Sequence, residues 1–364
     1  MAKESLSCDL AVVGGGPAGL AAAIEAAKAG VRVSLFDENE KPGGQLFKQI
    51  HKFFGSKEHQ AGIRGHDIGY HLLDECQKVG VDTRLNTVVW GIEDNKIGIV
   101  NEKASRIVDA KRIIVATGAS ENPLSFPDWT LPGVMGAGAA QTMMNVDRVL
   151  PGTKVLMVGS GNVGLIVTYQ LLLAGAEVVA VVEALPKIGG YIVHAAKLRR
   201  AGVPILTSTS ILEARGKEAV EEATICSLDD NLSPIPGCGR TLEVDLICLA
   251  VGLSPLVELC WMVSCKFKYL SELGGFVPIH DENMKTTLSY LYVAGDVAGV
   301  EEASCAMEEG KLAGVSVAEE LGYLKKNKAE EEKEKIRKRL TSLRLGPFGD
   351  MRAQAKLELM RARG

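Results

Sequence analysis

The chain has 364 residues, 46% hydrophobic and 24% charged, which is enough apolar material for two packed domains. Its formal net charge of -4 argues against a nucleic-acid partner or an anionic membrane surface. The first apolar run ends in glycines too early for a signal segment or a membrane span, and the eight cysteines are scattered, as is typical of a reducing compartment. We therefore expect a cytoplasmic protein without disulfides.

The first predicted element is a βαβ unit, CDLAVVGGGPAGLAAAIEAAKAGVRVSLFDE. Gly14 would allow a tight turn, Gly16 would let the backbone approach a pyrophosphate, and Gly19 would let the helix pack closely on the sheet. Asp37, or its neighbour Glu38, would then accept hydrogen bonds from ribose hydroxyls. The alternative is a purely structural turn, which the preceding strand, the following helix and the spacing of the acid disfavour.

The same pattern returns at residues 154–183 as KVLMVGSGNVGLIVTYQLLLAGAEVVAVVE, with Gly159, Gly161 and Gly164 in the glycine positions. Glu183 ends the second strand, where a carboxylate would accept a hydrogen bond from a free ribose 2′-hydroxyl and repel a 2′-phosphate, so NAD is favoured over NADP. The alternative is a duplicated fold that kept its glycines for packing after losing its nucleotide.

Three further apolar strands run into turns of small residues: RIIVATGAS (112–120), DLICLAVGLSP (245–255) and YLYVAGDVAG (290–299). Such turns permit close approach of the backbone to a ligand. CWMVSC (260–265) has two cysteines, which we interpret as free buried thiols because no second cluster completes a metal site. No metal is expected.

Together these motifs resemble the flavoproteins with two dinucleotide-binding domains, a group that includes thioredoxin reductase. The resemblance covers nearly all of residues 8–322 and implies an α/β fold with two Rossmann-like domains, the NAD-type domain being inserted in a discontinuous FAD-type domain. It implies an FAD-binding domain of residues 1–125 and 280–325, an NAD(P)-binding domain of residues 126–279, and a helical C-terminal tail of residues 326–364.

The resemblance also implies the cofactor-binding positions. In the group, the first glycine unit and the late Gly-Asp motif hold FAD, and the opening of the following helix lies near the flavin pyrimidine, where a helix N-terminus stabilises the reduced ring. The residues carried over to FAD are Gly14, Gly16, Pro17, Ala18, Gly19, Asp37, Glu38, Gly44, Gln45, Val89, Ala116, Thr117, Gly118, Gly295, Asp296, Ala303 and Ser304. Those carried over to NAD, or to another adenine nucleotide such as ATP, are Gly159, Gly161, Asn162, Val163, Glu183 and Gly252. No catalytic acid or base stands out.

Disulfide reductases of this fold need two cysteines close in sequence beside the flavin. PGGQLFKQIHKFFGS (42–56), which follows the first unit, has none, and neither does the segment beyond the second glycine motif. This predicts an FAD-dependent oxidoreductase that is not a disulfide reductase.

The strings PGGQLFKQIHKFFGS, GASENPLSFPDWTLPGVMGAGAAQTMMN and YVAGDVAGVEEASCAMEEG resemble the alpha subunits of heteromeric amine and imino-acid dehydrogenases. That group includes opine oxidases, hydrogen cyanide synthase, sarcosine oxidases and dye-linked proline dehydrogenases. The resemblance implies transfer of electrons within a hetero-oligomer, in which the partners are a catalytic flavoprotein subunit, together with a small iron–sulfur subunit. Two alternatives stay open: a stand-alone NADH-dependent reductase of a small redox protein, and a nucleotide-binding scaffold without turnover.

The tail after residue 325 mixes lysine, arginine and glutamate at helical spacing, and LGPFGD (345–350) interrupts it before a second helical stretch. A solvated helix is the ordinary interpretation. The sequence leaves open whether the tail contacts another subunit or packs on its own domain.

Overall fold

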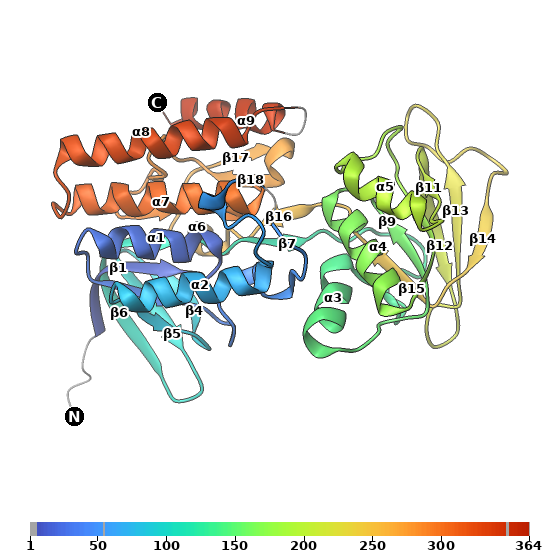
Figure 1. The fold of residues 1–364 in the computed structure, drawn as a ribbon, viewed down its shortest axis with the longest axis horizontal. Coiled ribbons are helices and arrows are strands. Elements are labelled where there is room, and N and C mark those ends of the chain that lie inside the picture. The colour runs from blue at the N-terminus through green and yellow to red at the C-terminus, as the bar shows by residue number, and fades with distance from the viewer. Residues whose placement is uncertain (1–5, 54, 347–348, 364) are drawn as a thin grey trace. The chain divides into compact units, whose positions relative to one another are not determined.

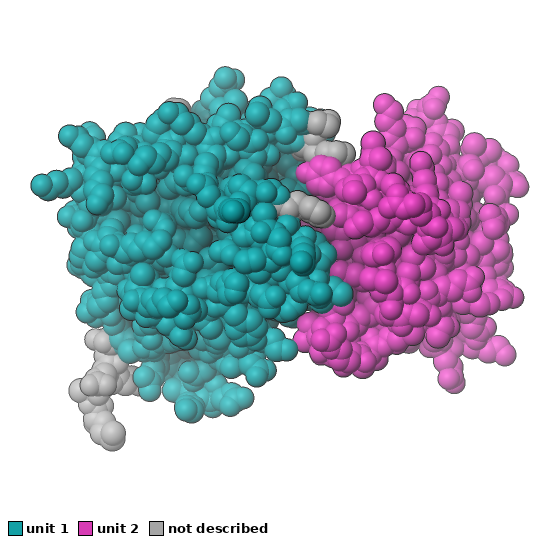
Figure 2. Space-filling view, in the orientation of Figure 1, with its two compact units in different colours: residues 1–120, 254–364 teal, residues 121–253 magenta. Residues whose placement is uncertain are grey.

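The computed structural model describes residues 6–53, 55–346 and 349–363. The chain divides into two compact units, residues 1–120 with 254–364 (unit 1) and residues 121–253 (unit 2), which Figure 2 colours separately. It passes between them at β7 (Ala119–Glu121) and β16 (Leu253–Pro255). A discontinuous domain with a second domain inserted is the architecture that the sequence predicts.

Unit 1 is built on a seven-stranded sheet in the order β3-β2-β1-β6-β5-β4, with β19 paired to β6. The strands β3, β2, β1, β6 and β19 are parallel, whereas β5 runs antiparallel to the first half of β6 and β4 antiparallel to β5. The strands are β1 (Leu6–Val13), β2 (Val33–Phe36), β3 (Asp82–Arg84), β4 (Val88–Glu93), β5 (Lys96–Val100), β6 (Ser105–Val115) and β19 (Leu291–Val293). The antiparallel hairpin β17 (Phe267–Leu270) and β18 (Gly275–Pro278) lies outside this sheet.

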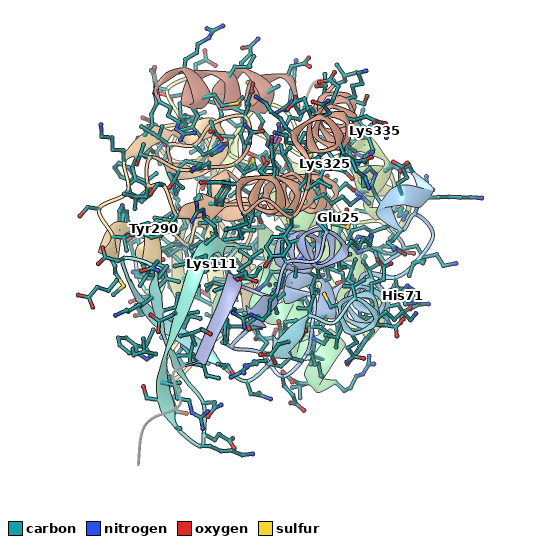
Figure 3. The ribbon with its side chains drawn as sticks, turned by 90° about the vertical axis from the view of Figure 1, so that its left-hand side faces the viewer. Glu25, His71, Lys111, Tyr290, Lys325 and Lys335 are labelled. Atoms are coloured by element: carbon teal, nitrogen blue, oxygen red, sulfur yellow. A yellow bond between two sulfur atoms is a disulfide. The ribbon has the colours of Figure 1, made fainter. Side chains whose placement is uncertain are left out.

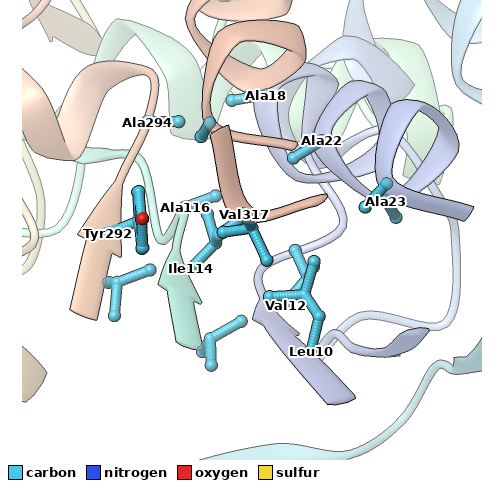
Figure 4. Packing of buried hydrophobic residues seen from close by; sticks show 14 of the residues in the cluster. Leu10, Val12, Ala18, Ala22, Ala23, Ile114, Ala116, Tyr292, Ala294 and Val317 are labelled. Carbon is cyan, nitrogen blue, oxygen red and sulfur yellow. The ribbon is translucent and has the colours of Figure 1, made fainter. Parts of the chain in front are cut away.

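The helices of unit 1 are α1 (Pro17–Lys28), α2 (Gly65–Lys78), α6 (Glu258–Met262), α7 (Ala303–Glu320), α8 (Lys326–Leu343) and α9 (Asp350–Arg361) (Figure 1). Helix α1 packs between α2 and α7. Its alanines and the glycines of α7 bring the two helices into backbone contact, since a methyl group on Gly310 would collide with the carbonyl oxygen of Ala18. Ala18, Ala22 and Val317 meet β1 in one buried cluster (Figure 4). This packing ties the first glycine unit to the last helix of the sequence-predicted fold.

The C-terminal tail is part of unit 1 and packs on its own domain. Helix α8 lies along α7 and buries Ala329, Ile336 and Leu340, while Lys335, labelled in Figure 3, lies on its exposed face. Helix α9 adds Ala355 and Leu359 to a small core with the β17–β18 hairpin. The sequence pattern of a solvated helix therefore describes only the outer face of α8.

Unit 2 has a parallel five-stranded sheet, β11-β10-β9-β15-β8, between helices on one face and an antiparallel three-stranded sheet, β12-β13-β14, on the other. Successive side chains of β9 point to opposite faces of the parallel sheet. Val155 and Met157 contact the helices, whereas Leu156 and Val158 contact the antiparallel sheet. The strands are β8 (Val134–Gly136), β9 (Lys154–Val158), β10 (Glu177–Val182), β11 (Ile205–Leu206), β12 (Thr209–Arg215), β13 (Glu222–Ser227), β14 (Arg240–Glu243) and β15 (Leu246–Leu249). The α-helices are α3 (Ala137–Thr142), α4 (Asn162–Ala174) and α5 (Ile192–Arg200).

The observed unit boundaries, 120 and 253, differ from the expected boundaries at 125 and 279. The second difference is the larger one. Residues 254–279 return to unit 1 early, because Val257, just before α6, and Cys260, on α6, are buried in the main core of that unit. The expected separate tail, residues 326–364, likewise belongs to unit 1.

The expectation of a chain without disulfides is wrong, because Cys226 and Cys238 are bonded to each other. Cys226 lies on β13 and Cys238 shortly before β14, and the antiparallel pairing of these strands brings their Cα atoms to 5.3 Å. The two cysteines are 12 residues apart in the sequence, and this spacing alone does not show that they are bonded. The six other cysteines are free and buried, Cys260, Cys265 and Cys305 among them.

Candidate dinucleotide sites

The predicted FAD residues of unit 1 gather at the carboxyl edge of its parallel strands. Gly14 follows β1, Asp37 follows β2, Ala116 follows β6 and Gly295 follows β19 by one residue. Backbone hydrogen bonds link these ends, with Ala116 N donating to Val13 O at 2.7 Å and Ala294 N to Val115 O at 3.1 Å. The carboxyl edge of a parallel sheet is where open α/β folds bind ligands.

The glycine turn has the backbone that the sequence predicts. Gly14 has a φ of 105°, a conformation that favours glycine. A Cβ on Gly19 would collide with the carbonyl oxygen of Gly14, so this glycine permits close contact between turn and helix. By contrast, a Cβ on Gly16 would meet only the Cα of Gly44, at 4.0 Å. The backbone at Gly16 is thus open to a ligand at the N-terminus of α1.

Asp37 is buried beside this turn. Its Oδ2 accepts a hydrogen bond from Gly15 N at 2.5 Å, and its Oδ1 accepts from Asn39 N and Nδ2 at 2.8 and 2.9 Å. A carboxylate offers about four acceptor positions, so Asp37 keeps one for a ribose hydroxyl. Its neighbour Glu38 is exposed. These residues fit the adenosine half of a dinucleotide.

Other predicted FAD residues surround the same turn. Gly43 N donates to Gly15 O at 2.8 Å, and Gly44 packs against the Cα of Gly16. The next residue, Gln45, is exposed. Thr87 N, just before β4, donates to Asp37 O at 2.8 Å. Val89 follows two residues later on β4, where it pairs with Ile99 of β5.

The turn after β6 is hydrogen-bonded to the residue that follows β16. Thr117 Oγ1 donates to Leu256 O at 2.7 Å, and Gly118 has a φ of 79°, with no atom within 4 Å of the place where a Cβ would lie. The hydroxyl of Thr117 therefore has a structural partner, as does the carbonyl of Gly118, which accepts from Leu256 N at 3.0 Å, while the space beside the Cα of Gly118 is open.

The Gly-Asp motif lies in a 3₁₀ turn, Asp296–Ala298, that leads into α7. Gly295 has a φ of 77°, and Asp296 Oδ1 accepts a hydrogen bond from Glu301 N at 3.3 Å. Burial and the neighbouring Glu309 raise the pKa of the Asp296 carboxyl to about 7. Ala303 and Ser304 form the first turn of α7, as the sequence predicts, and burial raises the pKa of the next residue, Cys305, to about 12. Cys305 is therefore an unreactive thiol at neutral pH.

Unit 2 repeats the geometry of the first glycine turn. Gly159 has a φ of 103°, and Glu183 Oε2 accepts hydrogen bonds from Ser160 N and Oγ at 2.9 and 2.6 Å. Oε1 accepts from Leu185 N at 3.0 Å, so Glu183, like Asp37, keeps one of about four acceptor positions. A Cβ on Gly161 would find nothing within 4 Å, so the position of this glycine is open at the N-terminus of α4, where partial positive charge favours a phosphate.

A contact that sequence reasoning missed lies on this second turn. Tyr191 N donates to Asn162 Oδ1 at 2.9 Å, and Gly189 N donates to Ser160 Oγ at 3.1 Å. A Cβ on Gly190 would lie 2.9 Å from Asn162 N. Residues 189–191, the strap, thus rest on the start of α4. The glycine pair in PKIGG was the available signal for this close approach.

The remaining predicted residues of unit 2 differ in their setting. Val163 is exposed on the first turn of α4. Gly252 has a φ of 115° and lies two residues after Ala250. A Cβ on Gly159 would collide with the carbonyl oxygen of Ala250, so this segment lies against the second glycine turn.

Across the described residues, no group of three or more histidine, cysteine or acidic side chains could hold a metal ion. Within the same residues, no helix combines the length and apolar character needed to span a membrane.

The family model for pyridine nucleotide-disulphide oxidoreductases matches residues 8–310, which include both glycine turns and the Gly-Asp motif. The chain belongs to this family. Members are oxidoreductases, and the two Rossmann-like units agree with the fold that the sequence predicts. The family match ends within α7, before α8 and α9.

Curated relatives agree with the resemblance seen in the sequence. The A subunit of opine oxidase from Agrobacterium tumefaciens is 30% identical over 86% of this chain and 66% of its own length. Hydrogen cyanide synthase subunit HcnB of Pseudomonas aeruginosa is 28% identical over 84% of this chain and 70% of its own. The chain thus spans about two thirds of these relatives, and both are named as subunits.

Solved structures share the fold. L-proline dehydrogenase from P. horikoshii has a TM-score of 0.69 at 24% identity, covering 92% of this chain and 59% of that one. Thioredoxin reductase from T. acidophilum has a TM-score of 0.72 at 20% identity, covering 86% and 99%.

The prediction that excluded the disulfide reductases is wrong. The family is named for disulphide oxidoreductases, and the matching folds include thioredoxin reductases and a bacillithiol disulfide reductase. The prediction relied on the positions of cysteines, but parallel sheets, glycine turns and helix packing define this fold, and a cysteine pair is a small addition to it. The oxidoreductase class itself stands.

Proposed function

We propose that unit 1 binds FAD, that unit 2 binds NAD, and that the chain transfers electrons as one subunit of an enzyme that oxidises an amine or imino acid. The observation that carries this proposal is the repeated turn. In each unit a buried or half-buried carboxylate accepts a hydrogen bond from the middle amide of the glycine turn, Gly15 with Asp37 and Ser160 with Glu183. Each carboxylate keeps one acceptor position for a ribose hydroxyl.

The two cofactors, when bound, supply hydride and electron transfer between nicotinamide and flavin. The chain's part is to bind and orient. Gly16 and Gly161 would admit the two pyrophosphates at the starts of α1 and α4, where partial positive charge favours phosphate. The carboxylate of Glu183 would repel a 2′-phosphate, which favours NAD over NADP, with ATP as a further adenine nucleotide to be tested.

The names of the relatives support a heteromeric assembly. The A subunit of opine oxidase, hydrogen cyanide synthase subunit HcnB and the alpha subunit of sarcosine oxidase are each one part of a larger protein. For this chain the partners would be a flavoprotein subunit that oxidises the substrate and a small iron–sulfur subunit, in the cytoplasm.

The test is the anaerobic absorbance spectrum of the full chain purified in the presence of FAD, recorded before and after NADH is added. Bound flavin that NADH bleaches would support both sites and electron transfer between them. Bound flavin that NADH leaves oxidised would support only the FAD site and direct the search to a partner subunit. A chain that retains no flavin would overturn the FAD assignment.

Two glycine variants separate the sites. A methyl group at Gly16 or Gly161 meets no atom closer than 4.0 Å, and both residues have negative φ, so Gly16→Ala and Gly161→Ala should fold normally. We expect Gly16→Ala to lose FAD and keep NADH binding, and Gly161→Ala to do the reverse. Each variant is the control for the other.

A further inference from the structure

Two cations of the C-terminal tail reach the turn that carries the Gly-Asp motif. These are Arg344, just after α8, and Lys356, on α9. The side chain of Lys356 is only 2% exposed, as is that of its partner Glu309 on α7. Long lysine side chains are almost never buried to this degree without a specific partner.

Lys356 contacts the turn both directly and through Glu309. Its Nζ donates to Ala298 O at 2.7 Å and to Glu309 Oε1 at 2.6 Å. The second oxygen of Glu309 accepts a hydrogen bond from Gly295 N at 3.0 Å. Both ends of the turn are therefore fixed by one lysine and one glutamate.

Arg344 holds the segment between the turn and α7. Its Nε and Nη2 donate to Glu301 at 2.9 and 2.5 Å, and Nη2 also donates to Glu309 Oε1 at 2.6 Å. The backbone N–H of Glu301 in turn donates to Asp296 at 3.3 Å. A two-pronged pairing of this kind fixes orientation as well as charge.

The tail cations balance the charge of two buried carboxylates. The side chains of Glu301 and Glu309 are 5% and 2% exposed, and Arg344 and Lys356 offset their negative charge beside the Gly-Asp turn. The family match ends at residue 310, so both cations come from a part of the chain outside it.

From these contacts we propose that Arg344 and Lys356 are positioning residues for the dinucleotide of unit 1: by fixing residues 295–301 they hold the Gly-Asp turn and the start of α7 in the geometry that binds it. This proposal rests on the FAD site proposed above. It assigns the tail a role inside the cofactor site rather than at a contact between subunits.

The experiment compares Arg344→Met and Lys356→Met in the full chain with two exposed tail controls, Lys335→Met on α8 and Arg361→Met on α9. Fluorescence titration gives the FAD dissociation constant, the visible spectrum reports the environment of bound flavin, and NADH titration reports unit 2. Each of the two test variants should weaken FAD binding about tenfold or more, because the Gly-Asp turn would no longer be held in the binding geometry, and should shift the flavin bands. NADH binding and both controls should be unchanged.

A conservative variant and a charge-neutral pair guard against simple unfolding. Arg344→Lys keeps the positive charge but loses the two-pronged hydrogen bonding of the guanidinium group to Glu301. Its FAD affinity should therefore fall between those of the wild type and Arg344→Met. Lys356→Met combined with Glu309→Gln removes a buried charge pair together, and it should fold even where Lys356→Met alone does not. This double variant should still bind FAD more weakly than the wild type, because Ala298 has lost its donor.

The outcomes are distinct. Variants that fold and bind FAD with the wild-type constant and spectrum would overturn this proposal and leave the FAD site standing. A wild-type chain that binds no FAD would overturn both.

Discussion

The imidazole Nε2 of His59 lies 3.1 Å from Oε1 of Glu308, although 249 residues separate them. Both side chains are buried, and Ser56 Oγ lies 2.9 Å from the other ring nitrogen. Lys311 and Arg339 also donate to the carboxylate of Glu308, at 2.6 and 2.8 Å. Glu308 therefore ties the loop after the first glycine unit to α7 and to the tail helix α8.

Removing this charge should destabilise unit 1. Burial raises the pKa of Glu308, but the hydrogen bonds from His59 and Lys311 outweigh it and lower the pKa to about 2. Glu308→Gln should lower the free energy of unfolding at pH 7 by about 3 kcal/mol. Because the folded pKa lies below the usual value near 4.5, this loss should be complete above that pH and shrink as the pH falls toward 2. Urea unfolding across this range, with exposed Glu334→Gln as the control, measures it. An equal loss at pH 7 and at a pH of about 2.5 would contradict the charge argument.

Asp296 should show the opposite pH dependence. Burial is the largest cause of its raised pKa, about 7, with Glu309 adding to it and the N–H of Glu301 opposing it. The folded state thus holds a proton that the unfolded state releases near pH 4, so the wild type should lose stability as the pH rises from 4 to 7. Asp296→Asn cannot ionise and should gain on the order of 2 kcal/mol relative to the wild type across that window. Unfolding without nucleotide at both pH values tests this. A constant difference would show that Asp296 does not titrate there.

The sequence was sufficient to predict the two units because each is specified locally. Strand, glycine turn and acid lie within about thirty residues, and collisions such as Gly19 with Gly14 occur inside that span. The acids Asp37 and Glu183 both lie beside their turns, as their spacing predicts.

What the sequence did not reveal depends on distant pairing. Lys356 meets Ala298 across 58 residues, and in a helix rich in charge nothing distinguishes it from the exposed lysines of the same tail. The disulfide and the early return to unit 1 at residue 254 also depend on pairings between segments that spacing alone does not specify.

The disulfide of unit 2 should contribute to stability. The bond between Cys226 and Cys238 closes a loop with a sequence separation of 12, which in the chain-entropy account corresponds to about 3 kcal/mol. We expect a reducing agent to lower the thermal midpoint of unit 2, and the double variant Cys226→Ser, Cys238→Ser to have that lower midpoint with or without reductant. A wild-type midpoint that does not respond to reductant, in protein whose thiols have been counted before and after, would contradict this role.

The strap on the second glycine turn should control binding at unit 2. A Cβ on Gly190 would lie 2.9 Å from the backbone nitrogen of Asn162. Gly190→Ala must therefore displace either the strap or the first turn of α4, where the phosphates of a dinucleotide are expected. We expect Gly190→Ala to weaken NADH binding about tenfold relative to the wild type, a loss of about 1.4 kcal/mol. Fluorescence titration with NADH measures the dissociation constant, and the thermal midpoint of unit 2 reports any loss of folding. A folded Gly190→Ala variant with the wild-type NADH affinity would mean that the strap lies away from the nucleotide, and would count against the assignment of the α4 N-terminus as its phosphate site.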